Sequence, residues 1–511
     1  MTLGELLRDA AQHAPFDAAG VGAIAAGHAA APVSAIAYDS RQVSQGSVFV
    51  ALRGLQADGT AFVQDAVARG AIAVVADTPA GGAAVPWLVV SDARLALAAL
   101  SAAFCRHPSE KLTLVGITGT NGKTTTSYVL QSIFEAAGIR CGRIGTVGHR
   151  VGAREVEASR TTPEAPELQR LLRDMVAHGS GACVMEVSSH ALALRRADVL
   201  RFSAAIFTNQ TRDHLDFHQD MEDYFLAKRR LFELLPPGGV GVSNLDDPRG
   251  PAFAAAATRP VTYAIDAPAD VRPGPLTFTL EGLAFEARTP RGTLHLRSPL
   301  VGRPNAYNLL AAIATATALD LPFDAIERGV ASLAHVPGRF QVVSGPDDDV
   351  RVVVDYAHTD DALKNLLETA RPLASGRVMT VFGCGGDRDR TKRPLMGAVA
   401  ARLSDVVIVT SDNPRSENPD QIIEQIMRGI VAPADRPAGR APAGKAPLHL
   451  AIPDRKGAIE RAVHDARPGD LVLIAGKGHE KYQVIGDRVL PFDDVEVARS
   501  ALARRRAGSR V

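Results

Sequence analysis

Short apolar runs recur along the chain and alternate with stretches in which apolar residues return every three or four positions. In the last third, the apolar runs lie at residues 351–354, 377–382, 406–409 and 471–475. Comparable runs occur earlier, at residues 112–115, 182–187 and 204–208. Strand-like runs separated by helical periodicity are typical of parallel sheets joined by crossover helices. The pattern therefore predicts an α/β protein.

The chain is longer than one hydrophobic core usually serves. At 511 residues, it is expected to form two to four domains. The apolar pattern divides into three units, which we predict at residues 1–110, 111–338 and 339–511. The segment 432–447 is rich in Ala, Pro and Gly, and we interpret it as a flexible surface insertion within the last unit.

Charge and cysteine content narrow the class of protein. The 57 basic and 56 acidic residues nearly balance, which does not favour nucleic acid or an anionic membrane as a partner. The four cysteines are scattered without a Cys-x-x-Cys pair, as expected for reduced thiols in a cytoplasm. The first 13 residues mix charged and apolar side chains and do not form a signal peptide. No apolar run is long enough to span a bilayer.

A glycine-rich segment at residues 116–126 follows the apolar run at 112–115 and precedes a helical pattern that continues through Ala137. This order of strand, glycine-rich turn, Lys-Thr and helix is that of a phosphate-binding loop. Lys123 can reach the outer phosphates of a nucleotide, and Thr124 can bind Mg²⁺. The spacing of the glycines departs from the strict motif, because Gly122 lies six residues after Gly116.

Two polar clusters follow apolar runs of the middle unit. Glu186 ends one run and is followed by Ser188, Ser189 and His190; the second cluster occupies residues 208–218. Open α/β sheets bind ligands at the carboxyl ends of their strands, so we expect both clusters near the phosphate loop. A carboxylate at the end of a buried strand is costly unless it binds a cation or accepts hydrogen bonds. Thr124, Glu186 and His214 are therefore the candidate magnesium ligands.

A third cluster, Asp412-Asn413-Pro414-Arg415, follows the apolar run at 406–409. Arg415 can hold a carboxylate in a bidentate fork, while Asp412 and Asn413 can accept hydrogen bonds from an ammonium group. Pro414 stiffens the turn between them. The cluster can therefore bind both ends of a zwitterion such as an amino acid.

Several of these strings resemble one known family. The loop Gly-x-x-Gly-x-Asn-Gly-Lys-Thr resembles that of the Mur ligase superfamily, which joins amino acids to carboxylates through acyl phosphates. Glu-Val-Ser-Ser-His at 186–190, Thr-Arg-Asp-His-Leu-Asp-Phe-His at 211–218 and Gly-Cys-Gly-Gly-Asp-Arg-Asp at 383–389 look like those of one branch, the UDP-N-acetylmuramoyl-tripeptide synthetases. The resemblance covers nearly the whole chain. It implies an N-terminal UDP-binding domain, a central P-loop ATPase domain and a C-terminal Rossmann-like domain.

The resemblance also implies a reaction and its catalytic residues. The reaction is ATP-dependent addition of meso-diaminopimelate to the D-glutamate carboxylate of UDP-MurNAc-L-Ala-D-Glu, in the cytoplasmic phase of peptidoglycan synthesis. The implied catalytic residues are Lys123, Glu186, His214, Lys228 and Asp355. Ala-Lys-Arg-Arg-Leu-Phe at 227–232 matches the segment whose lysine is carbamylated by CO₂. The carbamate of Lys228 would help Thr124, Glu186 and His214 to hold two Mg²⁺ ions.

The remaining implied residues bind the three substrates. For ATP they are Gly119, Thr120, Asn121, Gly122, Lys123, Thr124, Thr125, Asn305 and Arg339. For UDP-MurNAc-dipeptide they are Ser40, Thr161, Thr162, Ser188 and Arg196. For diaminopimelate they are Arg388, Asp412, Asn413, Arg415, Gly476 and Glu480. The chain departs from the family pattern at Thr60, Leu194, Arg303-Pro304 and Asp360.

Three alternatives stay open at the level of sequence. The chain could add lysine to the same nucleotide, or glutamate to folate as the folylpolyglutamate synthetases of this superfamily do. It could also be a noncatalytic nucleotide-binding regulator, although the presence of Lys123, Glu186, His214 and Lys228 argues against that. We expect a monomer, and the sequence does not identify a general base.

Overall fold

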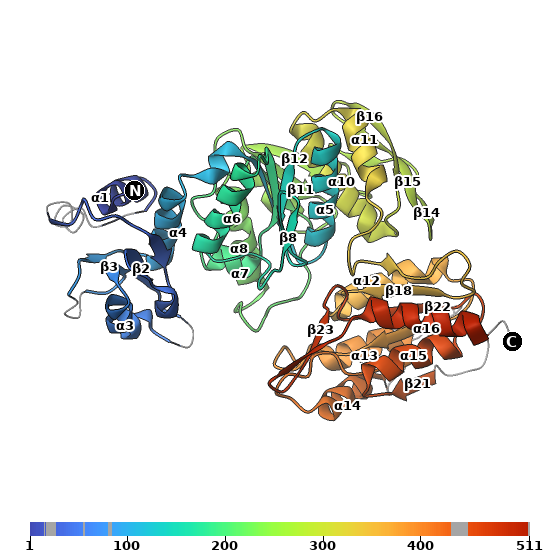
Figure 1. Cartoon of the computed structure of the whole chain (residues 1–511). Helices are drawn as coiled ribbons and strands as arrows, with labels where there is room; N and C mark the ends of the chain where they lie inside the picture. Colours follow the sequence, from blue (N-terminus) through green and yellow to red (C-terminus); the bar gives the residue numbers. More distant parts are fainter. Residues whose placement is uncertain (15, 17–26, 55–56, 80–83, 431–447, 509–511) are drawn as a thin grey trace.

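The computed structural model describes residues 1–14, 16, 27–54, 57–79, 84–430 and 448–508, which form three α/β units in chain order (Figure 1). The insertion expected at 432–447 lies outside the described residues. None of the helices in the described part of the chain has both the length and the apolar character that crossing a membrane requires.

The N-terminal unit is a parallel sheet flanked by helices. Its strands, in the spatial order β1-β2-β3-β4, are β1 (Ala35–Ala37), β2 (Ser47–Ala51), β3 (Ala71–Ala76) and β4 (Trp87–Val89). Its helices are α1 (Leu3–Ala10), η1 (Ser40–Gln42), η2 (Gly59–Phe62), α3 (Val63–Ala68) and α4 (Ala93–Phe104). Thr2 and Glu5 form a capping box that starts α1, and the apolar face of α1 packs on α4.

The central unit has eight strands in the order β12-β11-β10-β5-β9-β6-β7-β8. These are β5 (Thr113–Thr118), β6 (Cys141–Ile144), β7 (His149–Val151), β8 (Arg154–Val156), β9 (Ala182–Glu186), β10 (Ala204–Phe207), β11 (Val240–Asn244) and β12 (Arg259–Tyr263). The helices are η3 (Pro108–Lys111), α5 (Lys123–Ala136), α6 (Ala165–Ala177), α7 (Ser189–Ala193), α8 (Met221–Glu233), α9 (Gly250–Ala255), α10 (Arg303–Ala318) and α11 (Phe323–Ser332). A separate antiparallel sheet contains β13 (Arg272–Pro273), β14 (Thr277–Thr279), β15 (Gly282–Thr289) and β16 (Gly292–Ser298).

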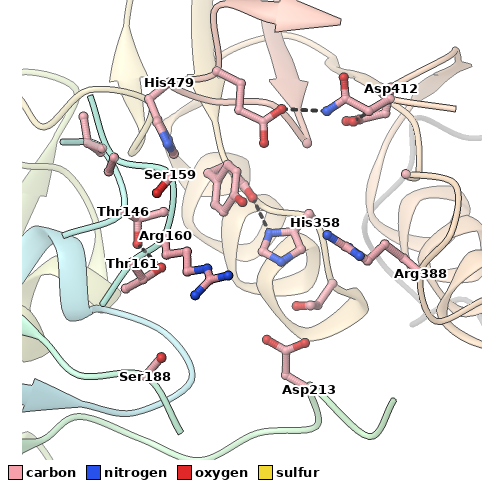
Figure 2. Close-up of a pocket in the computed structure, with 18 of the residues that line it drawn as sticks. Thr146, Ser159, Arg160, Thr161, Ser188, Asp213, His358, Arg388, Asp412 and His479 are labelled. Carbon is pink, nitrogen blue, oxygen red and sulfur yellow. Dashed lines mark hydrogen bonds between the residues drawn. The ribbon is translucent and has the colours of Figure 1, made fainter. Parts of the chain in front are cut away.

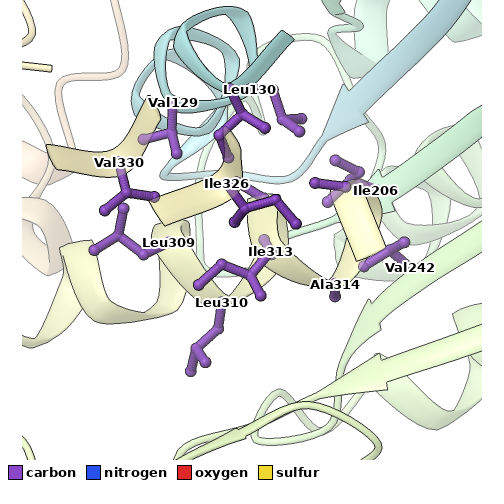
Figure 3. Close-up of a cluster of buried hydrophobic side chains, with 14 of the residues drawn as sticks. Val129, Leu130, Ile206, Val242, Leu309, Leu310, Ile313, Ala314, Ile326 and Val330 are labelled. Carbon is purple, nitrogen blue, oxygen red and sulfur yellow. The ribbon is translucent and has the colours of Figure 1, made fainter. Parts of the chain in front are cut away.

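A continuous apolar core joins α5, α10 and α11 to the central sheet. Leu309 and Ile313 of α10 lie among Leu130 of α5, Ile326 of α11 and Ile206 of β10 (Figure 3). All five side chains are fully buried. This core fixes the start of α5, and with it the phosphate loop, against the sheet.

Gly116 differs from the sequence expectation, which counted it as the first glycine of the loop. It lies inside β5, which continues to Thr118. A Cβ atom on Gly116 would stand 2.7 Å from the ring of Phe202 and 3.0 Å from Leu231. The glycine therefore permits close packing on one face of the strand, and the loop itself begins at Gly119.

The C-terminal unit has six strands in the order β17-β18-β22-β19-β20-β21, all parallel except β17. The strands are β17 (Gln341–Val342), β18 (Arg351–Asp355), β19 (Val378–Phe382), β20 (Val406–Val409), β21 (Leu448–Ala451) and β22 (Leu471–Ala475), with a hairpin of β23 (Tyr482–Ile485) and β24 (Arg488–Pro491). The helices are α12 (Asp360–Ala370), η4 (Arg371–Leu373), α13 (Lys392–Leu403), α14 (Pro419–Ile430), α15 (Arg455–Asp465) and α16 (Asp494–Gly508). The four strands predicted in this unit are confirmed as β18, β19, β20 and β22.

Candidate active site

The phosphate loop joins the end of β5 to the start of α5. Gly119 and Gly122 have φ angles of +141° and +90°, which side chains rarely adopt. A Cβ atom on Gly119 would lie 1.9 Å from Oγ1 of Thr208. Nζ of Lys123 donates to the carbonyl oxygens of Gly119 at 2.6 Å and Thr120 at 2.9 Å. Burial lowers the pKa of Lys123. The loop thus places a cation beside closely packed backbone, as phosphate binding requires.

Glu186 ends β9, the strand next to β5, and is almost fully buried. Its Oε2 accepts hydrogen bonds from the hydroxyls of Thr124 and Thr146, both at 3.0 Å. Its Oε1 accepts from the backbone N–H of Thr146 at 2.9 Å. Nη2 of Arg339 donates to Oγ1 of Thr124 at 3.2 Å. These adjacent oxygens are the donor type that Mg²⁺ prefers, so Thr124 and Glu186 fit a magnesium site.

Lys228 lies on α8 beneath the phosphate loop, with 1% of its surface exposed. Its Nζ donates to Oγ1 of Thr120 at 3.3 Å and lies 3.0 Å from the centre of the Tyr224 ring. Burial, followed by the nearby charge of Lys123, lowers the pKa of Lys228 to about 5. The amine is therefore neutral near pH 7, which is the form that can react with CO₂.

The candidate site residues line two adjoining cavities. The smaller one, of about 260 Å³, lies over the phosphate loop; its lining includes Thr120, Asn121, Gly122, Lys123, Thr124, Thr125, Glu186, His214, Asn305, Arg339 and Asp355. Gly119 and Lys228 are not among its lining residues. Asp213, His214 and His358 line both cavities, which places these side chains at the passage between them.

Asn305 and Asp355, which also line the smaller cavity, have protein partners as well. Asn305 donates from Nδ2 to the carbonyl of Val301 at 2.8 Å and accepts from Asn308 at 3.0 Å, which leaves one amide hydrogen for a ligand. Asp355 accepts from the backbone N–H groups of Phe340 and Ala357 at 2.6 and 2.8 Å. Asp355 therefore orders the chain that enters the C-terminal unit.

The larger cavity, of about 1290 Å³, lies between the central and C-terminal units. Thr161, Thr162, Ser188 and Arg196 line its central side. The opposite side carries the whole expected amino-acid set, Arg388, Asp412, Asn413, Arg415, Gly476 and Glu480. Figure 2 shows Thr161 and Ser188 on one side of the cavity and Arg388 and Asp412 on the other. Ser40, by contrast, lies in η1 of the N-terminal unit and lines neither cavity.

On the C-terminal side of the larger cavity, hydrogen bonds join residues that lie far apart in the sequence. Oδ1 of Asn413 accepts from Nζ of Lys477 at 3.0 Å, and its Nδ2 donates to Oε2 of Glu480 at 2.8 Å. Lys477 also donates to Glu480 at 3.0 Å. Nη1 of Arg415 donates to the carbonyl of Gly386 at 2.7 Å. Asn413 therefore orients Glu480 in this structure, rather than offering a free oxygen to an ammonium group.

Three side chains of the site, Thr146, Lys477 and His358, were not among the residues predicted from the sequence. Thr146 follows β6 and binds Glu186; as a polar residue just after an apolar strand, it carried the same signal as Glu186. Lys477 is fully buried beside Glu480 and lies between the predicted residues Gly476 and Glu480 in the sequence. His358 lies three residues after the predicted Asp355 and lines both cavities; its pKa is lowered to about 4 by burial and by the charge of Lys392.

The fold and its phosphate loop define an enzyme class that uses a nucleoside triphosphate. Three family models match successive parts of the chain: Mur ligase family, catalytic domain (residues 32–105); Mur ligase middle domain (117–316); and Mur ligase, glutamate ligase domain (338–478). The chain belongs to the Mur ligase family, the ATP-dependent amide ligases, and the expected three-domain α/β architecture is confirmed.

Individual relatives cover nearly the whole chain. The UDP-N-acetylmuramoyl-L-alanyl-D-glutamate--2,6-diaminopimelate ligase of Gloeobacter violaceus is 47% identical over 477 residues, which span 93% of this chain and 95% of the relative. The enzyme of the same name from Geobacter metallireducens is 46% identical over 488 residues, 93% of this chain and 95% of the relative. A solved structure of a ligase with that name has a TM-score of 0.67 at 35% identity, covering 93% of this chain and 96% of the other.

A more distant structure supports the fold alone. The MurF ligase of Thermotoga maritima, solved in complex with ADP, has a TM-score of 0.62 at 18% identity and covers 93% of this chain and 99% of the other.

Proposed function

We propose that this protein joins meso-diaminopimelate to the D-glutamate carboxylate of UDP-MurNAc-L-Ala-D-Glu, using ATP, in the cytoplasm. The relatives at 46–47% identity carry the name of that ligase. The structural observation that carries the proposal is the larger cavity, where Asp412, Arg415 and Glu480 line the side facing away from the phosphate loop. A guanidinium can pair with a carboxylate, and two carboxylates can pair with ammonium groups. This set suits diaminopimelate, which carries a carboxylate and an ammonium group at each end.

The proposed reaction has two steps. The D-glutamyl carboxylate attacks the γ-phosphorus of ATP, ADP leaves, and an acyl phosphate forms. The amine of diaminopimelate then attacks the acyl carbon, and the tetrahedral intermediate collapses to an amide with loss of phosphate. Lys123, at the loop, offsets the charge as two anions approach each other. His358 and Asp213 stand between the two cavities, where the acyl phosphate must meet the amine.

Magnesium would be held by Thr124, Glu186 and His214, where it would neutralise phosphate charge. We propose a second Mg²⁺ held by Lys228 as its carbamate, formed when the neutral amine adds CO₂. The depressed pKa and the burial of Lys228 support this, because an ammonium ion would not react and would repel the metal.

Each of the three domains predicted from the sequence is assigned one part of the reaction. We propose that residues 1–110 bind the UDP part, residues 111–338 bind ATP and catalyse phosphoryl transfer, and residues 339–511 bind the amino acid. Thr161, Thr162, Ser188 and Arg196 would bind the dipeptide part, with Ser40 on the uridine side. We propose a monomer without a nucleic-acid partner.

The decisive experiment is a panel of amino acids tested with ATP and UDP-MurNAc-L-Ala-D-Glu, with ADP release as the measurement. We expect release to require both the nucleotide peptide and meso-diaminopimelate. Equal turnover with L-lysine would favour the lysine-adding alternative. Turnover of glutamate with a folate would favour the folylpolyglutamate type, and absence of ADP release with every amino acid would favour a regulator.

A further inference from the structure

Three potential metal ligands that line neither cavity meet at the joint between the N-terminal and central units. Asp9 lies in the last turn of α1, His13 lies in the turn that follows α1, and His107 lies in the turn that follows α4. One ligand atom from each lies within 4.8 Å of the other two. Within the described ranges, this is the one group of three or more His, Cys, Asp or Glu side chains whose ligand atoms lie this close together.

The chain brings these residues together through an unusual turn. Arg106 and His107 are consecutive residues with φ angles of +60° and +47°, a left-handed conformation that few side chains adopt. The backbone N–H of His107 donates to the carbonyl of Ala102 at 2.9 Å, which folds the turn back onto the end of α4. The His107 ring then reaches α1, where its Nε2 lies 2.7 Å from Oδ1 of Asp9.

The third ligand is positioned to complete the set. The ring centroids of His13 and His107 are 5.1 Å apart, with the rings tilted by 47°. His13 is exposed, so its ring can turn toward Asp9 without disturbing packing. Asp9 and His107 keep 34% and 17% of their side-chain surface exposed, which leaves a path for an ion and room for a water ligand.

We propose that Asp9, His13 and His107 form a binding site for a transition-metal dication, with Zn²⁺ as the representative ion. Two imidazoles and one carboxylate, with water as a fourth ligand, match the preferences of Zn²⁺. Magnesium, which prefers six oxygen ligands, is a poor fit. A bound ion fastens the end of α1 to the turn that leads from α4 into β5, and thereby stiffens the joint between the two units.

Zinc binding to the chelator-treated full-length protein tests the proposal. Calorimetric titration with ZnCl₂ in excess Mg²⁺ keeps the oxygen-rich site over the phosphate loop occupied. We expect the wild type to bind one more equivalent of Zn²⁺ than His13→Ala, or to bind it at least about ten-fold more tightly. Zinc should raise the melting temperature of the wild type and leave that of His13→Ala unchanged.

Matched variants separate this site from other zinc sites. His464 is a control, because it lies 3.0 Å from Asp465 in an exposed His–Asp pair with no second histidine in that group. His464→Ala should bind zinc like the wild type, and Asp9→Asn should bind it like His13→Ala. Ligase activity in Mg²⁺ without zinc reports that each variant is folded. Unchanged stoichiometry and affinity in both His13→Ala and Asp9→Asn would mean that Asp9 and His107 form only a hydrogen bond, and would overturn the proposal.

Discussion

Arg415 is the side chain most directly suited to distinguishing diaminopimelate from lysine. Among the residues that the structure describes, its side chain donates one hydrogen bond, from Nη1 to the carbonyl of Gly386. The other edge of the guanidinium therefore stays available to a carboxylate in the larger cavity. Diaminopimelate has a carboxylate at the far end of its side chain, and lysine has none.

Arg415→Ala should raise the KM for diaminopimelate steeply and leave the KM values of ATP and the nucleotide peptide nearly unchanged. Losing one partner of such a pair costs roughly 2–5 kcal/mol, or about thirty-fold to several thousand-fold. Arg415→Lys should recover little, because lysine lacks the bidentate fork. Steady-state kinetics would measure both effects. Arg428→Ala is the control, because Arg428 is exposed. A variant that kept the preference for diaminopimelate over lysine would remove Arg415 from this role.

Lys228 gives a second prediction for a single residue. Lys228→Ala should lower kcat by about 100-fold or more, because the proposed carbamate would hold the Mg²⁺ ion that offsets negative charge in the transition state. Acetate or bicarbonate should restore part of the activity by supplying a small carboxylate in the space that is left. Lys456→Ala, which changes an exposed lysine, should behave as the wild type. Full activity of Lys228→Ala at ordinary magnesium would contradict the carbamate.

At the scale of elements, the turn between β5 and α5 depends on glycine for space. We expect Gly119→Ala to abolish ATP binding, since its Cβ atom would overlap Oγ1 of Thr208 and the residue would keep an unfavourable φ angle. The overlap should also lower stability by about 1–3 kcal/mol. Gly274→Ala is the control, because its nearest contact would be 3.7 Å. Nucleotide titration calorimetry and urea unfolding would measure the two effects, and wild-type ATP affinity in Gly119→Ala would refute the first.

Glu417, in the turn after β20, forms ion pairs with Arg393 at the start of α13 and with Arg390 in the loop after β19. Arg393, which is fully buried, donates to both carboxylate oxygens of Glu417 at 2.9 and 3.0 Å. Glu417 also accepts from the backbone N–H of Asp387 at 2.6 Å. The hydrogen bonds from Arg393 lower the pKa of Glu417 to about 2.

Because the pKa of Glu417 is lowered, the effect of Glu417→Gln on the free energy of unfolding should depend on pH. The ionised carboxylate stabilises the folded state fully above about pH 4.5, and this stabilisation is lost as the pH falls toward 2. Glu417→Gln should therefore be less stable than the wild type at pH 6, by about 1–3 kcal/mol, and the difference should shrink at pH 3. Urea unfolding at both pH values measures this. A difference that stayed constant with pH would show that charge is not the cause.

The elements that the sequence predicted well are those defined locally. Strands β18, β19, β20 and β22 follow directly from apolar runs. Lys123 follows from its place between the glycine-rich turn and α5, and Glu186 from its place at the end of β9. Gly116 was misassigned because a glycine looks the same in a loop and in a strand that packs against Phe202. The contacts of Lys477 with Asn413 and of Arg393 with Glu417 join residues 64 and 24 positions apart, and no local pattern reveals which such pairs meet.

At the scale of the whole molecule, the expected substrate sites belong to different units, and polar side-chain contacts join the central unit to the C-terminal unit. Arg212 of the central unit pairs with Asp389 of the C-terminal unit at 3.1 Å. Asn121 donates to Asp361 at 3.3 Å across the same boundary. The alignment of the acyl phosphate with the amine therefore depends on contacts that contribute little to folding.

Arg212→Ala should lower kcat several-fold while changing the KM values and the free energy of unfolding little. An exposed ion pair contributes about 0–1 kcal/mol to stability, whereas a small misalignment of reacting groups slows catalysis strongly. Arg229→Ala is the matched control, because Arg229 forms a similarly exposed pair with Glu233 inside one helix. Kinetics and denaturation on the same preparations would test this. A rise in KM with unchanged kcat would assign Arg212 to substrate binding instead.

The hydrogen bonds from Lys123 to the carbonyls of Gly119 and Thr120 have a consequence for inhibitor design. The loop supplies its own acceptors for this cation, so an anion that binds Lys123 competes with the carbonyls of Gly119 and Thr120. A compound with one negative oxygen exchanges one hydrogen bond for another and gains little net affinity. A compound that presents several anionic oxygens to Lys123 and to the N-terminus of α5 at once gains more than it displaces. Inhibitors directed at this loop should therefore imitate a chain of phosphates, and single carboxylate or sulfate fragments should bind weakly even though they fit the space.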